Sequence, residues 1–565
     1  MSRPVFDLAQ TYVEARLALD PYGATFLGAP GYEDKCTDLS PTAARARVEC
    51  DKSFLEDLAK LPVPPDDAER VAIEVIRERI EARVVQFAAG EHLRDLGVLW
   101  SSAHLPRMVF DLMPRTNDAE WANVAARLEG VEASLAGARA SLVEGMSQGL
   151  FAARRQAVGV AKTFAVWCGT ESEGSAKEQP WFAGLVAEYA GHDQGLKARL
   201  AAGADSATAA YGQLVAFLQD EYAPAAPDHD GVGEERYSAL ARYWTGADLN
   251  LRETYAWGWS EVERIASRIR QVCDVLRPGL SPEAVAAELD EDPAYQIAGE
   301  QNLLTYLQEL TDRTTADFAE KYFEIPDVML RCEARLAPPG GAAAPYYNGP
   351  SEDFSRPGTT WFPTQGQDSF STWRLPTIWY HEAVPGHHLQ VGYSVYRADR
   401  LTRVQRMEFV SGHGEGWALY AERLMDELGY FTDPATELGF LSAQVWRAVR
   451  IVLDIGLHLG LPVPAGEQLA GAPAAGSEWT RDNAVVFLRT QALLAQGFAE
   501  SEVDRYLGLA GQAISYKVGE RVWLDARADA QSRHGDSFDL KAWHAYALAL
   551  GSMGLDPLRA ELARF

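Results

Sequence analysis

The sequence contains few cysteines and no long apolar run. Five cysteines occur among 565 residues, and none belongs to a C-x-x-C pair. This spacing excludes a thiolate zinc finger and argues against a disulfide framework. No stretch reaches the roughly 18 consecutive apolar residues that a transmembrane helix needs. The first residues, MSRPVFDLAQTYVEARLALDPYG, lack the apolar core of a signal peptide, so we expect a cytoplasmic protein.

Positive charge is also scarce. The chain has 52 Lys and Arg against 80 Asp and Glu, which gives a formal net charge of −28. Binding to nucleic acid or to an anionic membrane needs a basic surface, so we expect neither as a partner. The hydrophobic content of 47% is typical of a globular protein. The oligomeric state is left open.

Helical periodicity dominates the chain. Residues 69–93 and 117–146 place apolar side chains at steps of three and four. We therefore predict a mainly α protein with two helical halves around a cleft, residues 1–225 and residues 236–565, which form either two domains or one continuous body. The Pro-, Gly- and acid-rich segment 220–235 is predicted to connect them. Further helical patterns cover 198–219, 248–276, 304–323, 404–428, 443–459, 483–495 and 511–532.

The longest non-helical stretch is 338–367. Within it, residues 359–362 are β-branched or aromatic and are bounded by Pro357-Gly358 and Pro363. This composition predicts a short strand. Because the strand would lie just before the residues that carry the chemistry, it is a candidate part of the site.

Four residues suited to metal chemistry occur together in HEAVPGHHLQ: His381, Glu382, His387 and His388. The whole chain has only 11 histidines, so three within eight residues form a marked cluster. A catalytic zinc takes three such ligands and keeps a fourth position open for water, and a nearby Glu can accept the proton of that water. Burying these groups without a metal costs several kcal/mol, which makes a purely structural cluster the weaker interpretation.

The spacing of these histidines does not fit a regular helix. Position i+4 from His381 is Pro385, and the next histidines stand at i+6 and i+7. On a regular helix i+6 lies about 240° round and i+7 rises about 10.5 Å, too far for two nitrogens about 2.0–2.1 Å from one zinc. We therefore predict a local bulge at Pro385-Gly386 that returns His387 to His381. His388 then packs nearby, and a register with His388 as the ligand is the alternative.

This segment resembles the DUF885 family, which is grouped with the gluzincin metallopeptidases and carries the signature H-E-x-x-P-G-H-x-x-Q. Residues 415–422 resemble the family's E-G-W-A-L-Y-x-E, and residues 511–519 resemble its G-Q-A-x-S-Y-x-x-G. Segments 111–115 (DLMPR) and 356–358 (RPG) also look familial. The signature is matched at His381, Glu382, Pro385, Gly386, His387 and Gln390.

The resemblance implies a site for one zinc ion. His381 and His387 would be ligands and Glu382 the general base. The gluzincin plan takes a third ligand from a later helix, and Glu415 is the natural candidate. Glu422, on nearly the same helix face, would orient a ligand histidine.

The resemblance also implies substrate contacts. Tyr516 would donate to the developing oxyanion, although a core tyrosine is an equal alternative. Arg521 would pair with a substrate carboxylate, or else form a structural ion pair. His388 and Gln390 would support the ligands or contact substrate. His413 would be either a substrate contact or a loop residue.

The implied fold is a zincin-like helical metallopeptidase with a short antiparallel β element near the active site. The strand at 359–362, which includes Thr360, resembles the edge strand that binds extended peptide by strand addition. The implied function is zinc-dependent hydrolysis of peptide bonds in short peptides, by a metal-activated water with Glu382 as base. The alternatives are a zinc hydrolase of a non-peptide amide or ester and a non-catalytic peptide-binding relative. Cobalt or manganese in place of zinc stays open.

Overall fold

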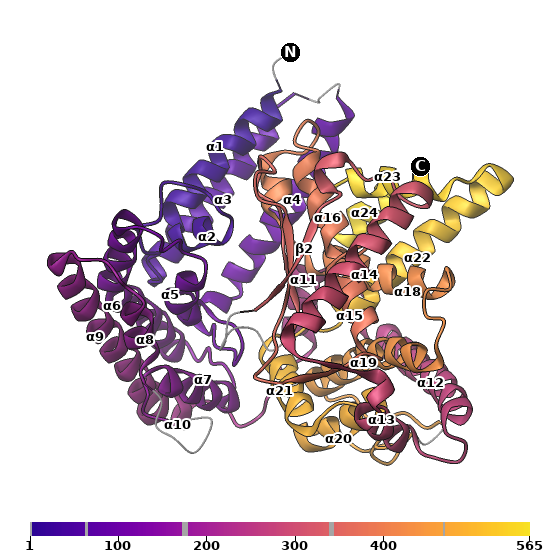
Figure 1. Ribbon diagram of the computed structural model, residues 1–565. Coiled ribbons are helices and arrows are strands. Elements are labelled where there is room, and N and C mark those ends of the chain that lie inside the picture. Colours follow the sequence, from indigo (N-terminus) through magenta and orange to yellow (C-terminus); the bar gives the residue numbers. More distant parts are fainter. Residues whose placement is uncertain (1–2, 63–65, 172–178, 338–343, 467–468) are drawn as a thin grey trace. The chain divides into compact units, whose positions relative to one another are not determined.

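The computed structural model describes residues 3–62, 66–171, 179–337, 344–466 and 469–565, so the first six residues of the non-helical stretch, 338–343, lie outside it. Helices account for 68% of the chain and strands for 3%, which confirms a mainly α protein (Figure 1). The chain divides into two compact units. Unit 1 comprises residues 1–64, 80–232 and 507–509, and unit 2 comprises residues 65–79, 233–506 and 510–565.

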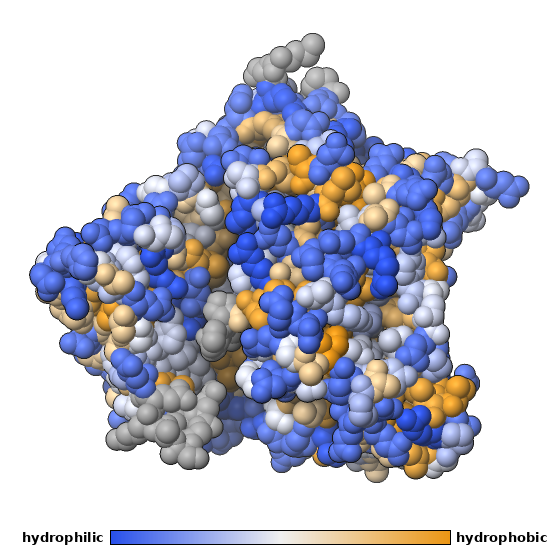
Figure 2. Space-filling view, in the orientation of Figure 1, coloured by the Kyte–Doolittle hydropathy of each residue, from blue (hydrophilic) through white to orange (hydrophobic). Residues whose placement is uncertain are grey.

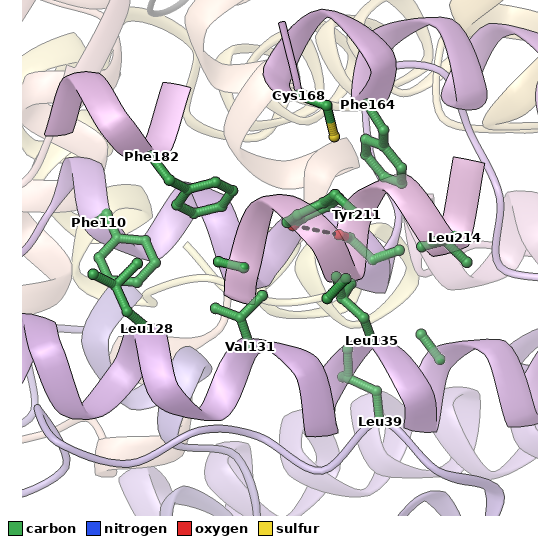
Figure 3. Close-up of a cluster of buried hydrophobic side chains, with 14 of the residues drawn as sticks. Leu39, Phe110, Leu128, Val131, Leu135, Phe164, Cys168, Phe182, Tyr211 and Leu214 are labelled. Carbon is green, nitrogen blue, oxygen red and sulfur yellow. Dashed lines mark hydrogen bonds between the residues drawn. The ribbon is translucent and has the colours of Figure 1, made fainter. Parts of the chain in front are cut away.

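Unit 1 is a helical body built around one apolar core. Figure 3 shows side chains of α6, such as Val131 and Leu135, facing Tyr211 and Leu214 of α9. The Tyr211 hydroxyl donates to the carbonyl of Ala103 at 3.0 Å, so its only polar atom is satisfied inside the core. The helices are α1 (Pro4–Leu19), α2 (Pro21–Phe26), α3 (Pro41–Lys60), α5 (Leu105–Met108), α6 (Asp118–Ser147), α7 (Arg154–Trp167), α8 (Trp181–Ala187), α9 (Gln194–Phe217) and α10 (Ala223–Ala225), and α4 (Asp67–Ala88) runs through both units.

Unit 2 carries the histidine cluster. Its longest helix pair is α12 against α19, and α19 is well defined at both ends: Asp433 accepts a hydrogen bond from the amide of Ala435, and Gly460 ends the helix at φ 63°. The helices are α11 (Glu234–Thr245), α12 (Leu251–Leu276), α13 (Pro282–Glu291), α14 (Glu300–Lys321), α15 (Leu375–Glu382), α16 (His387–Tyr396), α17 (Arg403–Met407), α18 (Ser411–Glu427), α19 (Pro434–Leu459), α20 (Arg481–Ala492), α21 (Gln496–Gly508, whose end reaches unit 1), α22 (Ser515–His534), α23 (Leu540–Ala549) and α24 (Leu555–Leu562).

Two small sheets lie in unit 2. Strands β1 (Gln296–Ala298) and β5 (Ser369–Ser371) pair antiparallel. The other sheet has the order β2-β4-β3, with β2 (Cys332–Leu336) parallel to β4 (Gly358–Phe362) and β3 (Tyr346–Asn348) antiparallel to it. The strand predicted at 359–362 is therefore confirmed.

The resemblance implied that this strand lies at the edge of its sheet. In the structure it is the central strand. Thr360 is opposite Ala334 of β2 on one side and Tyr347 of β3 on the other, so β4 has no free side for an added peptide. The Thr360 side chain is buried and lies 3.6 Å from the sulfur of Cys332. The expected substrate contact by Thr360 is therefore wrong. The strands that pair with β4 come from other parts of the sequence, so the residue pattern around 359–362 does not indicate them.

The helix predicted over 404–428 is two helices. α17 ends at Met407, and the chain is extended at Glu408 and Val410 before α18 begins. The Val410 amide donates to the hydroxyl of Ser552 at 3.1 Å instead of continuing a helix. This break gives α18 its own start, close to Glu415.

The surface in the view of Figure 2 is mostly hydrophilic, with hydrophobic residues in small patches. This agrees with the strong charge of the sequence. Among the described residues, no helix combines the length and hydropathy required for a membrane span. All five cysteines are free thiols, as expected from their spacing.

Three glycines let α18 and α22 come unusually close. A Cβ on Gly519 would lie 2.1 Å from the carbonyl oxygen of Gly412 and 2.6 Å from the Cα of Gly416. Only backbone atoms meet there, so no side chain can move aside. The contact places Glu415, next to Gly416, close to Tyr516, one turn before Gly519.

We predict that Gly519→Ala lowers the free energy of unfolding by more than about 3 kcal/mol, because the added methyl must force two helix backbones apart. Urea unfolding followed by circular dichroism measures this. Gly212→Ala in α9, where an added Cβ meets nothing within 4 Å, is the matched control and is expected to stabilise by up to about 1 kcal/mol. Equal stability of the two variants would contradict the packing argument.

Candidate metal centre

The chain breaks between the two predicted histidine ligands. α15 ends at Glu382 and α16 begins at His387, with a cis peptide bond between Val384 and Pro385. The amide of Gly386 donates to the carbonyl of Tyr380 at 3.0 Å. The predicted irregularity at Pro385-Gly386 is confirmed, although it is a break between two helices and not a bulge within one.

The break brings His381 and His387 together. Their ring centroids lie 5.0 Å apart, with the ring planes at 90°. Gly386 is required here, because a Cβ would lie 1.8 Å from the carbonyl oxygen of His381. Trp417 of α18 holds the turn by donating its indole N–H to the carbonyls of Pro385 and Gly386, at 3.0 and 3.2 Å.

Glu415 lies between the two imidazoles. Its Oε2 is 3.3 Å from Nε2 of His381 and 3.6 Å from Nε2 of His387. Ligand atoms about 2.0–2.1 Å from one tetrahedral zinc lie about 3.3–3.4 Å apart, so the two distances from Glu415 are close to those of a zinc site.

Glu382 is the second carboxylate of the cluster. Together with His381 and His387 it forms a buried group whose potential ligand atoms all lie within 4.8 Å of one another. By mutual distance alone Glu382 could be the third ligand. We favour Glu415 for that role, because one of its oxygens makes the close approach to both imidazole nitrogens. This leaves Glu382 beside the metal position, where a general base is needed.

Burial and neighbouring charge shift the acidity of these groups in opposite directions. Burial alone would lower the pKa of His381, but its contacts with Glu415 and Glu422 outweigh burial and raise that pKa to about 9. Burial would raise the pKa of Glu415, but the two imidazoles hold it well below its usual range. Burial raises the pKa of Glu382. The site thus holds one carboxylate that stays ionised and one that readily takes up a proton.

Glu422 fixes the orientation of His381. The Nδ1–H of His381 donates to Oε1 of Glu422 at 2.8 Å, and Glu422 is 0% exposed. A histidine held through Nδ1 presents an unprotonated Nε2 to a metal. The role implied for Glu422 therefore matches its position.

His388 is not placed to be a ligand. Its Nε2 donates to the carbonyl of Met329 at 2.7 Å, and its Nδ1 lies 3.0 Å from the hydroxyl of Tyr347. Burial lowers the pKa of His388 to about 4, so the ring is neutral and Nδ1 accepts the tyrosine proton. Both nitrogens are used, which leaves His387 as the second histidine of the cluster.

Tyr516 lies beside the cluster. Its ring centroid is 6.3 Å from that of His381, and the guanidinium of Arg450 stacks on it at 4.4 Å. Burial and the nearby Glu415 carboxylate raise the pKa of Tyr516, so the hydroxyl keeps its proton. That hydroxyl makes no hydrogen bond within the described part of the chain, which leaves it available as a donor.

Two expected site residues lie elsewhere. Arg521 is exposed, pairs with Asp525 at 3.7 Å and stacks on Trp257 at 4.8 Å, so its contacts are those of the ion-pair alternative. Five residues after Tyr516, it points to a different side of α22. His413 is buried in the first turn of α18 against Trp523, and therefore is not a loop residue.

Gln390 is buried on α16. Its Oε1 has no hydrogen-bond partner among the described residues and lies next to Gly414. This leaves an acceptor free close to Glu415, consistent with the supporting role implied for Gln390.

Sequence reasoning missed several supporting residues. Trp417 holds the turn between the histidines, and its position in the sequence does not indicate this role. Tyr347 and the carbonyl of Met329 fix His388, and neither carries a local signal. The RPG segment did indicate one supporting position. Gly358 is needed there, because a Cβ would lie 2.0 Å from the Tyr347 hydroxyl.

Comparison with known proteins identifies the family. Residues 21–562 match the profile of "Bacterial protein of unknown function (DUF885)", and the chain belongs to this family. The fold resembles two solved structures. One, from Colwellia psychrerythraea, has a TM-score of 0.83 and 23% identity, covering 99% of this chain and 98% of that one. The other, from Shewanella oneidensis, has a TM-score of 0.74 and 18% identity, covering 99% of each chain. No curated protein matches the chain.

These structures correct the expected location. Both are described as a "putative lipoprotein", the second also as "of unknown function". These descriptions of the two neighbours contradict the cytoplasmic location expected for this chain from its N-terminal residues. The N-terminal pattern alone did not carry enough information for that inference.

We predict that His387→Ala weakens zinc binding by more than about 100-fold, because it removes a ligand, whereas His388→Ala changes it by less than about 10-fold. Competition with a chromophoric chelator measures both affinities. His534→Ala, a half-buried histidine at the end of α22 that bonds to the carbonyl of Phe565, is the matched control and should bind zinc like the parent. Greater loss at His388 than at His387 would reverse the ligand assignment.

Proposed function

We propose that this protein is a zinc-dependent hydrolase of the gluzincin type that cleaves peptide bonds in short peptides. One observation carries the proposal: a single carboxylate oxygen of Glu415 lies 3.3 and 3.6 Å from the Nε2 atoms of His381 and His387. The DUF885 signature and its implied relationship to zincins support it.

The donor set suits zinc. Two neutral imidazoles and one carboxylate are the ligands of known catalytic zinc sites, which keep a fourth position open. His381, His387 and Glu415 would hold the ion. When bound, zinc supplies Lewis acidity, which lowers the pKa of a water and polarises a carbonyl group.

Glu382 is the proton carrier in this proposal. It takes a proton from the attacking water and delivers it to the leaving nitrogen. Its pKa is raised by burial, which brings it closer to the pH at which proton transfer in both directions is efficient. Tyr516 donates its free hydroxyl proton as a hydrogen bond to the carbonyl oxygen while negative charge develops there.

Among the described residues, the β2-β4-β3 sheet has one edge open to an extended peptide. On β2, the Gln308 side chain already bonds the amide of Ala334 at 2.8 Å and the carbonyl of Cys332 at 3.0 Å. The outer side of β3 pairs with no strand among the described residues, and Tyr347 of β3 contacts His388 beside the ligand His387. Strand addition along β3 would therefore bring a peptide to the cluster. A non-peptide amide or ester substrate would react at the same metal centre but would not pair with the edge of β3.

We predict that Glu382→Gln lowers turnover by about 10²–10⁴-fold while metal stays bound, because the amide cannot accept the water proton. Zinc-loaded protein is incubated with a mixed synthetic peptide library, and the products are read by mass spectrometry. The new peptide ends show whether cleavage is terminal or internal.

The matched control is Glu309→Gln on the exposed side of α14, which should cleave like the parent. Equal cleavage by the Glu382 and Glu309 variants would refute the assigned base. Absence of cleavage by the parent protein, with hydrolysis of simple amides or esters, would favour the non-peptide alternative. Tight peptide binding without any hydrolysis would favour the binding-only alternative.

Phe409 offers an apolar contact beside the metal position. Its side chain is 52% exposed, and its ring centroid lies 6.0 Å from that of His387. We predict that Phe409→Ala lowers kcat/KM by about 10-fold for substrates with a large apolar side chain next to the cleaved bond, and little for those with alanine there. Val486→Ala, also an exposed apolar residue but on α20, is the control. Equal losses for large and small substrate side chains would contradict this contact.

A further inference from the structure

A chain of buried polar side chains leads away from the metal centre. Behind Glu422, Gln444 of α19 donates its Nε2–H to Oε2 of Glu422 at 3.3 Å. Lys517 of α22 donates to Oε1 of the same glutamine at 2.7 Å. Gln444 and Lys517 are both buried. The chain therefore joins His381, Glu422, Gln444 and Lys517 across helices α15, α18, α19 and α22.

The direction of every hydrogen bond in this chain is fixed. An ammonium group can only donate, so Lys517 must meet the carbonyl end of the Gln444 amide. The N–H end of the amide then has to face Glu422, which in turn accepts from His381. Polarisation by the ammonium strengthens the amide as a donor in this buried setting.

The charge of Lys517 is balanced within the same region. It contacts Glu520, one turn further along α22, and lies 3.6 Å from Glu261 of α12. A buried ammonium needs such partners. Lys517 is therefore anchored independently of Gln444, and the glutamine links this ion pair to the metal centre.

Glu422 needs the directional contact from Gln444. Besides His381, Glu422 has a cationic neighbour in Arg447, which lies 3.7 Å from Oε1. This is beyond hydrogen-bond distance, so Arg447 supplies positive charge but does not fix the plane of the carboxylate. Without Gln444, Oε2 of Glu422 would be buried with no hydrogen bond, and the carboxylate could turn away from His381.

We propose that Gln444 is a positioning residue of the metal centre: held by Lys517, it locks the Glu422 carboxylate so that His381 presents Nε2 to the metal. This inference rests on the proposed function, because it requires that His381 is a ligand. It assigns to Gln444 a share of the metal affinity although Gln444 contacts neither the metal position nor substrate.

The test is the affinity of the purified full-length protein for zinc, measured by competition with a chromophoric chelator, together with the visible absorption of the cobalt(II) form. Gln444→Met keeps the length of the side chain and removes both hydrogen bonds. Gln444→Glu keeps an acceptor for Lys517, but it replaces the donor to Glu422 with a carboxylate oxygen and adds negative charge beside Glu422. We expect each variant to bind zinc about 10–100-fold more weakly, with altered cobalt bands.

Gln491→Met is the matched control. Gln491 is a buried glutamine of α20 that also donates through Nε2, to the carbonyl of Ala470 at 2.7 Å. It should lose stability but keep its zinc affinity and cobalt spectrum. If Gln444→Met does not fold, Gln444→Glu decides the question.

The possible results separate this inference from the proposed function. If the parent protein binds zinc and cleaves peptides, and a folded Gln444 variant binds zinc within about twofold of the parent, the positioning role is overturned and the proposed function stands. If the parent protein binds neither zinc nor cobalt, both are overturned. Weaker zinc binding in the Gln444 variants, with unchanged zinc binding in Gln491→Met, supports the positioning role.

Discussion

The site depends on a contact between two stretches of backbone. His381 and His387 are six residues apart, a spacing that a continuous helix turns to different faces. The chain solves this by ending one helix at Glu382 and starting another at His387, with the amide of Gly386 bonded to the carbonyl of Tyr380. The break leaves no room for a side chain at position 386, since a Cβ would lie 1.8 Å from the His381 carbonyl.

A second backbone contact brings residues of two further helices to the site. α18 supplies Glu415, Trp417 and Glu422, and its approach to α22 at Gly412 and Gly416 brings Tyr516 alongside. Trp417 connects the two contacts, because it sits on α18 and bonds the turn between the histidines. The E-G-W motif thus places one candidate ligand, one close-contact glycine and one tryptophan that holds the turn in consecutive positions.

Some of this could be predicted from the sequence. The 3.6-residue periodicity indicated helices, the β-branched residues before Phe362 indicated β4, and Pro385-Gly386 indicated that the helix could not continue. These are local signals, in which the residue and the feature it causes lie within a few positions.

The rest depended on partners far along the chain. β4 is central because β2 and β3 pair with both its sides, and His388 is unavailable because Met329 and Tyr347 occupy its nitrogens. Arg521 is a different case: it follows Tyr516 by five residues on α22, and that spacing turns its side chain well away from that of Tyr516. The polar chain through Gln444 has members on four helices, and no single segment shows it.

The balance of buried charge explains why the centre suits a dication. Glu382, Glu415 and Glu422 lie close together, and without a metal the nearest compensation is a proton on His381, whose pKa is raised to about 9. A raised histidine pKa adds stability that is fully present below the unfolded value of about 6.5 and is lost as the pH rises through 9. Zinc needs the neutral imidazole, so it would take over the role of that proton. In the proposed centre, metal binding would therefore replace the proton on Nε2 of His381, the ring that Glu422 holds through Nδ1.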